Sequence, residues 1–103
     1  MELADYINGL EMNGVQAEQL ENGKTEIVFT NVNQDFRFEI DNVNDIYNYY
    51  INFDVDEEVE MWLEAKRNGL QGVPSARELV FEESIIEETL RLLVKKTDAN
   101  LLF

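Results

Sequence analysis

The chain has 103 residues and a formal net charge of −14, from 22 acidic and 8 basic side chains. It contains neither Cys nor His, which excludes disulfides, thiolate nucleophiles, cysteine-based zinc sites and the commonest general base near neutral pH. The negative charge argues against direct nucleic-acid binding, because phosphates repel such a surface.

The apolar content predicts one folded domain over residues 1–103. Hydrophobic residues make up 45% of the chain and aromatic residues 11%, enough for a core despite the acidity. No apolar stretch is long enough to span a membrane, and Met1–Asp5 lacks the basic start of a signal peptide. We therefore expect a cytoplasmic protein with no membrane partner.

The N-terminal part of the chain predicts a short helix followed by an antiparallel sheet. Residues Ala4–Met12 have helical spacing, and Asn13-Gly14 follows as a helix stop. Three runs have the composition of strands: Val15–Leu20, Lys24–Thr30 and Asp35–Ile40. Turn-forming residues separate these runs, which predicts a three-stranded meander.

The register of this sheet follows from keeping its apolar side chains on one face. Pairing Phe29 with Phe36 achieves this in the second hairpin. In the first hairpin, Val15 meets Phe29 only if the loop has an odd number of residues. That favours a three-residue turn with Gly23 at a positive φ.

From Asn42 onward the apolar spacing becomes helical. The segments Asn42–Phe53 and Asp56–Asn68 are predicted helices, and a last helix begins after Ser75. Its apolar side is predicted to carry Leu79, Val80, Ile86, Leu90, Leu93 and Val94. A further capping pattern leaves open a break near Glu83, although one helix is favoured. The fold class is thus α+β, with two or three C-terminal helices packed on the sheet.

Acidic residues form two rows on the later helices. The first row is Glu57, Glu60 and Glu64, and the second is Glu83 and Glu87 with Glu78 and Glu82. Residues four apart on a helix are separated by about 6 Å along its axis, a spacing comparable to the charges of a nucleic-acid strand. A partner protein with a basic nucleic-acid-binding groove would accept such rows, and the alternative is a pair of solvated helix faces.

Three tyrosines and one tryptophan are the other residues of interest. Tyr47, Tyr49 and Tyr50 crowd one short helix, whose apolar arc is wider than a core contact needs. They suit a partner interface, including that of a homodimer, although burial beneath the sheet explains them equally well. Trp62 is expected in the core. Because 22 carboxylates make acidic pairs unavoidable, they predict no catalytic site, and we expect no metal and no cofactor.

The sequence FDVDEEVEMWLEAKRNG (Phe53–Gly69), continuing through GVPSARELV (Gly72–Val80), resembles small acidic proteins of phages, plasmids and integrated elements in Gram-positive gut bacteria. This resemblance implies a mobile-element setting and carries over no catalytic residues. In charge and size the chain is also similar to anti-CRISPR and antirestriction inhibitors, some of which look like nucleic acid to the enzyme they block.

These resemblances imply a non-catalytic inhibitor of a host nucleic-acid-directed defence enzyme, acting by nucleic-acid mimicry. The alternative is an accessory protein–protein interaction module of the mobile element. In that case the module would dock or dimerise through its tyrosines, and the acidity would serve solubility only.

Overall fold

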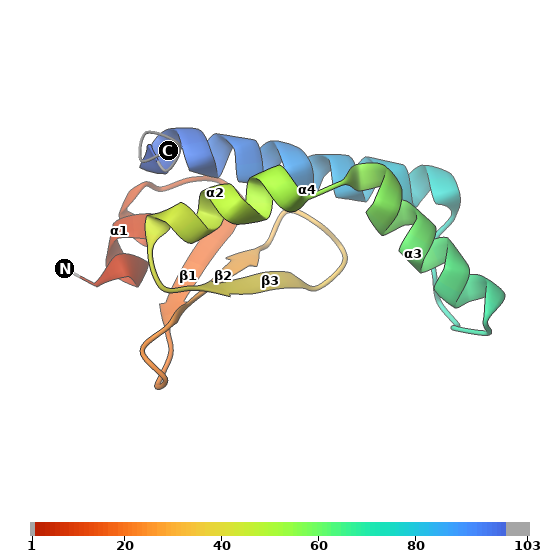
Figure 1. The fold of residues 1–103 in the computed structure, drawn as a ribbon, viewed down its shortest axis with the longest axis horizontal. Coiled ribbons are helices and arrows are strands. Elements are labelled where there is room, and N and C mark those ends of the chain that lie inside the picture. Colours follow the sequence, from red (N-terminus) through yellow and green to blue (C-terminus); the bar gives the residue numbers. More distant parts are fainter. Residues whose placement is uncertain (1, 99–103) are drawn as a thin grey trace.

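The computed structural model describes residues 2–98, in which four helices accompany one three-stranded sheet (Figure 1). In chain order the elements are α1 (Leu3–Gly9), β1 (Val15–Gln19), β2 (Thr25–Phe29), β3 (Phe36–Ile40), α2 (Val43–Asn52), α3 (Val55–Arg67) and α4 (Ala76–Thr97). The predicted α+β class is confirmed, with a short first helix, an antiparallel sheet and then three helices.

The sheet has the predicted order β1-β2-β3 and the predicted register. Val15 pairs with Phe29, and Phe29 pairs with Phe36. The backbone N–H of Leu20 donates to the carbonyl of Lys24 at 2.8 Å, and Gly23 has φ +86°. The first hairpin therefore closes with a three-residue turn that places glycine in the left-handed region.

Helices α2 and α4 cover one face of the sheet (Figure 1). Side chains from that face and from α1, α2 and α4 form one core cluster: Ile7, Val15, Ile27, Phe29, Phe38, Ile40, Ile46, Ile86, Leu90, Leu93 and Val94. The opposite face of the sheet carries exposed polar side chains, among them Arg37 and Glu39. Alternation of inward and outward residues along the strands thus decides which face is buried.

Helix α3 packs on α4 and not on the sheet, so α2 and α4 are the two C-terminal helices that cover the sheet (Figure 1). Helix α3 lies against the N-terminal part of α4, beyond the sheet (Figure 1). The 22-residue α4 is about 33 Å long, whereas a five-residue strand spans about 17 Å. Because α4 extends past the sheet, α3 packs against the turns of α4 that lie beyond the sheet.

Helix α1 ends at Gly9, earlier than the predicted end at Met12. The side-chain amide of Asn8 accepts from the backbone N–H of Ala17 at 2.9 Å and donates to its carbonyl at 2.8 Å. These bonds hold the end of α1 against β1, and Glu11 then turns the chain with φ +51°. The side chain of Asn8 thus takes the place of a further strand for two backbone groups of β1, which is an edge strand of the sheet.

Helix α4 is continuous, as predicted, with no break near Glu83. Ser75 caps its start by accepting from the backbone N–H of Glu78 at 3.3 Å. The hydroxyl of Ser84 donates to the carbonyl of Val80 at 2.6 Å, so it is used within the helix instead of starting a new one.

Gly14 provides a test of the packing between the first loop and the second hairpin. It has φ +83°, its carbonyl accepts from the N–H of Thr30 at 2.8 Å, and an added Cβ would lie 2.6 Å from Cγ of Asn31. We expect Gly14→Ala to lower the free energy of unfolding by about 3 kcal/mol, from backbone strain together with the steric clash. Urea denaturation measures this loss.

Gly23→Ala is the matched control, because Gly23 has a similar φ of +86° but no atom within 4 Å of an added Cβ. It carries only the strain of the left-handed conformation, about 1 kcal/mol. Equal losses for the two variants would show that the contact with Asn31 contributes nothing.

Candidate functional site

The first predicted acidic row lies on the exposed side of α3. Glu57, Glu60 and Glu64 are all exposed there, as expected. However, Nη2 of Arg67 lies 2.6 Å from Oε1 of Glu60 and 2.5 Å from Oε2 of Glu64. Hydrogen bonding to Arg67, together with its charge, lowers the pKa of the Glu64 carboxyl. Such exposed ion pairs stabilise the fold little, but they reduce the charge that Glu60 and Glu64 offer to a partner.

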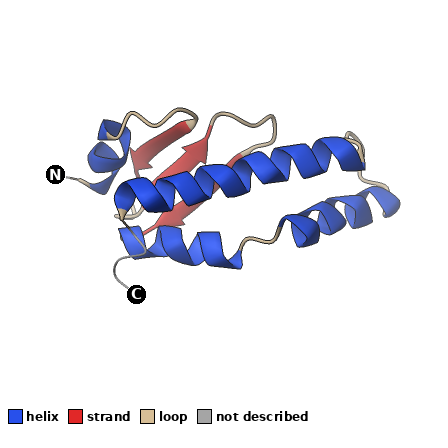
Figure 2. Cartoon of the chain, turned by 90° about the horizontal axis from the view of Figure 1, so that it is seen from above, coloured by secondary structure: helices blue, strands red, loops and turns tan. Residues whose placement is uncertain are grey.

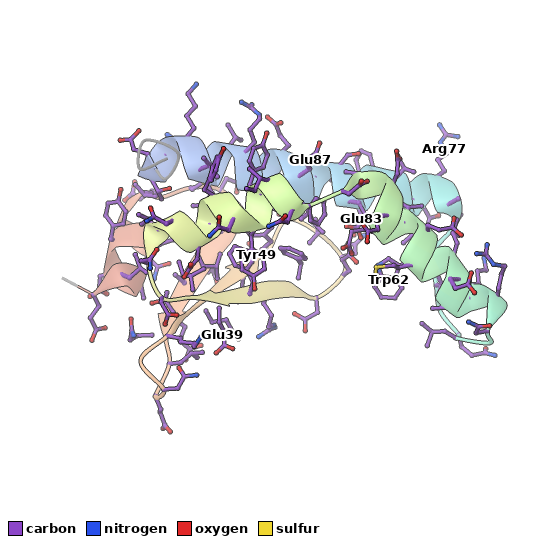
Figure 3. All side chains as sticks on the ribbon, in the orientation of Figure 1. Glu39, Tyr49, Trp62, Arg77, Glu83 and Glu87 are labelled. Atoms are coloured by element: carbon purple, nitrogen blue, oxygen red, sulfur yellow. The ribbon has the colours of Figure 1, made fainter. Side chains whose placement is uncertain are left out.

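The second predicted row is interrupted, because Glu83 is only 2% exposed. The prediction that Glu83 belongs to an exposed acidic face is therefore wrong. Its carboxylate accepts a hydrogen bond from Nε2 of Gln34 at 2.7 Å, beneath α4 (Figure 3). The sequence signal was present: Glu83 follows Leu79 by four residues and precedes Ile86 by three, which places it on the buried side of the helix.

Glu82 and Glu83 together fasten the loop between β2 and β3 to α4. Oε1 of Glu82 accepts from the backbone N–H of Asn33 at 2.6 Å. One further bond, from Nδ2 of Asn31 to the hydroxyl of Thr89 at 3.0 Å, holds the same loop. This part of the second row therefore has a structural role, because its oxygens accept hydrogen bonds from donors of the loop.

Four carboxylates remain around one hollow, where the link between α2 and α3 meets α4. We call it the acidic hollow, with a volume of about 740 Å³. Its acidic side chains are Asp54, Asp56, Glu57 and Glu87, and no Lys or Arg lines it. Glu57 and Glu87 come from the two predicted rows, on different helices, so the tertiary structure brings them to one site. Asp54 also accepts from the N–H of Glu57 at 3.1 Å and so caps α3.

The acidic hollow also contains exposed apolar side chains. Ile51 is 54% exposed and Val80 is 46% exposed. The prediction that Val80 lies on the buried side of α4 is wrong, because it lies about 100° around the helix from Leu79, which is buried. The site thus combines negative charge with apolar surface.

The tyrosines of α2 do not share one exposed face. Tyr49 is 42% exposed, and its ring lies 4.4 Å from that of Phe38 at an interplanar angle of 33°. Tyr47 and Tyr50 are half-buried and pack against the core cluster. Of the three, only Tyr49 is positioned as an exposed interface residue.

Within residues 2–98, sequence reasoning missed the most exposed aromatic residue. Phe81 on α4 is 67% exposed. It borders an apolar hollow of about 550 Å³ that is also lined by Trp62, Pro74 and Leu79. Trp62 is half-buried in this hollow and is not part of the core cluster, which corrects its prediction as a core residue (Figure 3). Phe81 and Leu79, which line the same hollow, lie on α4, and the pattern of α3 alone does not reveal them.

Two negative observations concern the part of the chain that the structure describes. Within residues 2–98, no group of three acidic side chains is arranged to hold a metal ion. No helix in the same range is long and apolar enough to cross a membrane. Comparison with known protein families, curated proteins and solved structures identified no match for this chain.

Glu58 makes the electrostatics of this region testable. Partial burial, reinforced by the negative charges of Glu83 and Glu57, raises the pKa of the Glu58 carboxyl. Because its folded-state pKa is raised, Glu58 contributes stability at low pH, and this contribution is lost as the pH rises through that pKa. We expect Glu58→Gln to raise the melting temperature at neutral pH by a few degrees. The gain should vanish below the ordinary carboxyl pKa of 4.5.

Thermal melts followed by circular dichroism across this pH range measure the effect. Glu21→Gln is the control for loss of one negative charge, since Glu21 lies exposed in the first hairpin turn. A lower melting temperature for Glu58→Gln at neutral pH would contradict the inferred repulsion.

Proposed function

We propose that this chain is a non-catalytic, cytoplasmic binding protein of a mobile element. In this proposal it occupies the basic nucleic-acid-binding groove of a host defence enzyme of the kind that anti-CRISPR and antirestriction inhibitors block. Its acidic hollow is the contact surface. The observation that carries the proposal is the gathering of Asp54, Asp56, Glu57 and Glu87 around one hollow that no Lys or Arg lines.

Electrostatic complementarity supports the choice of partner. Carboxylates with no neighbouring cation keep their attraction for an external positive charge, whereas Glu60 and Glu64 already share Arg67. Of the first row, only Glu57 therefore belongs to the proposed contact surface. Of the second row, only Glu87 does. Glu83 is excluded from it by burial.

The apolar side chains of the acidic hollow fit the same partner. Lys and Arg side chains combine a charged end with an aliphatic stem, which packs on apolar surface while the charge reaches carboxylates. Ile51 and Val80 offer such a surface beside Glu87 and Glu57. A groove lined by Lys and Arg therefore matches both the charge and the apolar side chains of the acidic hollow.

The test is a triple substitution that removes charge from the hollow and keeps the cap of α3: Asp56→Asn, Glu57→Gln and Glu87→Gln. The unmodified protein should inhibit cleavage of a labelled DNA duplex by a restriction endonuclease or an RNA-guided nuclease from a Gram-positive host. We expect the inhibition to be competitive with the duplex and to weaken steeply with salt. The triple variant should inhibit about tenfold less well or worse.

A second triple variant controls for net charge: Glu2→Gln, Glu11→Gln and Glu21→Gln, all at exposed positions outside the acidic hollow. It loses the same three charges and should inhibit as well as the unmodified chain. Equal losses in both triple variants would reduce the effect to net charge alone. Binding whose affinity does not change with salt concentration would rule out occupation of the groove. So would binding that leaves the DNA duplex bound to the nuclease.

An accessory interaction module of the mobile element is the second candidate function. The tyrosines of α2 support it less than expected, because Tyr47 and Tyr50 pack against the core cluster. The specific observation in its favour is the exposed apolar surface of α4, centred on Phe81.

A further inference from the structure

Apolar side chains continue along the outward side of α4. Phe81 is 67% exposed, Leu92 is 36% exposed, and Ile85 is half-buried between them. With Glu88 they are spaced by four, three and four residues, which places all of them on one side of the helix. We call Phe81, Ile85, Glu88 and Leu92 the outer stripe. Figure 2 looks onto α4, and no other described element covers its outward side.

Basic and acidic residues are mixed on α4, the helix that carries the outer stripe. Four of the eight basic residues of the chain lie on α4: Arg77, Arg91, Lys95 and Lys96. A net charge of −14 makes most surfaces of two copies repel one another. On α4 both signs of charge are mixed, so two copies can approach there with less repulsion than at a purely acidic surface.

The acidic member of the stripe is already paired within its own helix. Nε of Arg91 donates to Oε2 of Glu88 at 3.0 Å, and Nη2 donates to Oε1 at 2.5 Å. This hydrogen bonding lowers the pKa of the Glu88 carboxyl and keeps it ionised beside its partner. A second copy packed on the outer stripe therefore covers a Glu88 carboxylate that is already paired with Arg91, and not an unpaired one.

The spacing of the stripe reads the same in both directions along the helix. When two such helices pack antiparallel about a twofold axis, Phe81 of one copy faces Leu92 of the other. Ile85 then faces Glu88. The same surface serves both copies, as a symmetric dimer requires.

The ends of α4 decide between parallel and antiparallel packing. Glu78 and Lys96 are eighteen positions apart, which is five turns at 3.6 residues per turn, so they lie on the same side of the helix. Antiparallel packing brings Glu78 of one copy to Lys96 of the other. Parallel packing would place like charges together at both ends.

We propose that two copies of this chain associate through the outer stripes of their α4 helices, packed antiparallel. The inference does not rest on the proposed function, because Asp54, Asp56, Glu57 and Glu87 surround the acidic hollow and none of them belongs to the outer stripe. A dimer of this kind leaves both acidic hollows free for a partner.

Sedimentation velocity of the full chain tests the association. We expect a dimer of twice 12.0 kDa that dissociates on dilution. Phe81→Asp should raise the dissociation constant of the dimer about tenfold or more, because it places a new carboxylate on the apolar contact with Leu92 of the other copy. Met61→Asp is the matched control, since Met61 is a similarly exposed apolar residue, at 59%, on α3.

A pair of charge reversals tests the antiparallel arrangement. Glu78→Lys alone and Lys96→Glu alone should each weaken the dimer, because each places like charges opposite one another. The double variant restores the attraction and should associate as tightly as the unmodified chain. Circular dichroism of every variant confirms that the fold is retained.

Three results would overturn the inference. The first is a monomer of 12.0 kDa at the highest soluble concentration. The second is an equal effect of Phe81→Asp and Met61→Asp on association. The third is a double charge-reversal variant that associates no better than the single variants, which would exclude antiparallel packing of α4 as the contact.

Discussion

Burial of one side of α4 is the constraint on which the rest of the structure depends. The apolar face of the three-stranded sheet has to be buried against another element. Ile86, Leu90 and Leu93 on α4 are completely buried above it. The same helix extends past the sheet and supports α3, so its length decides the overall shape of the molecule (Figure 1).

The packing of α4 also divides the acidic residues into groups with different roles. Glu83 is buried and bonded to Gln34, Glu82 holds a loop backbone, and Glu88 is paired with Arg91. The 22 acidic side chains therefore outnumber those that are free of a partner within the molecule. In the acidic hollow, by contrast, Asp54, Asp56, Glu57 and Glu87 gather with no Lys or Arg among the described lining residues.

Two sides of α4 face outward with different chemistry. One side borders the acidic hollow through Val80 and Glu87, and another carries Phe81 and the outer stripe. The proposed contacts with a second copy and with a basic partner therefore use separate surfaces of the helix. The single long helix makes this possible because residues one or two positions apart point in well-separated directions.

Local pattern in the sequence determined the elements and their register, while only the tertiary structure decided what faces solvent on α3 and α4. Alternation along the strands and the odd loop before Thr25 predicted the pairing of Val15 with Phe29, since both are properties of neighbouring residues. The burial of Glu83 depends instead on Gln34, which lies 49 positions away. The exposure of Val80 and the gathering of Glu57 with Glu87 depend on how α3 meets α4, and no spacing within one helix encodes that angle.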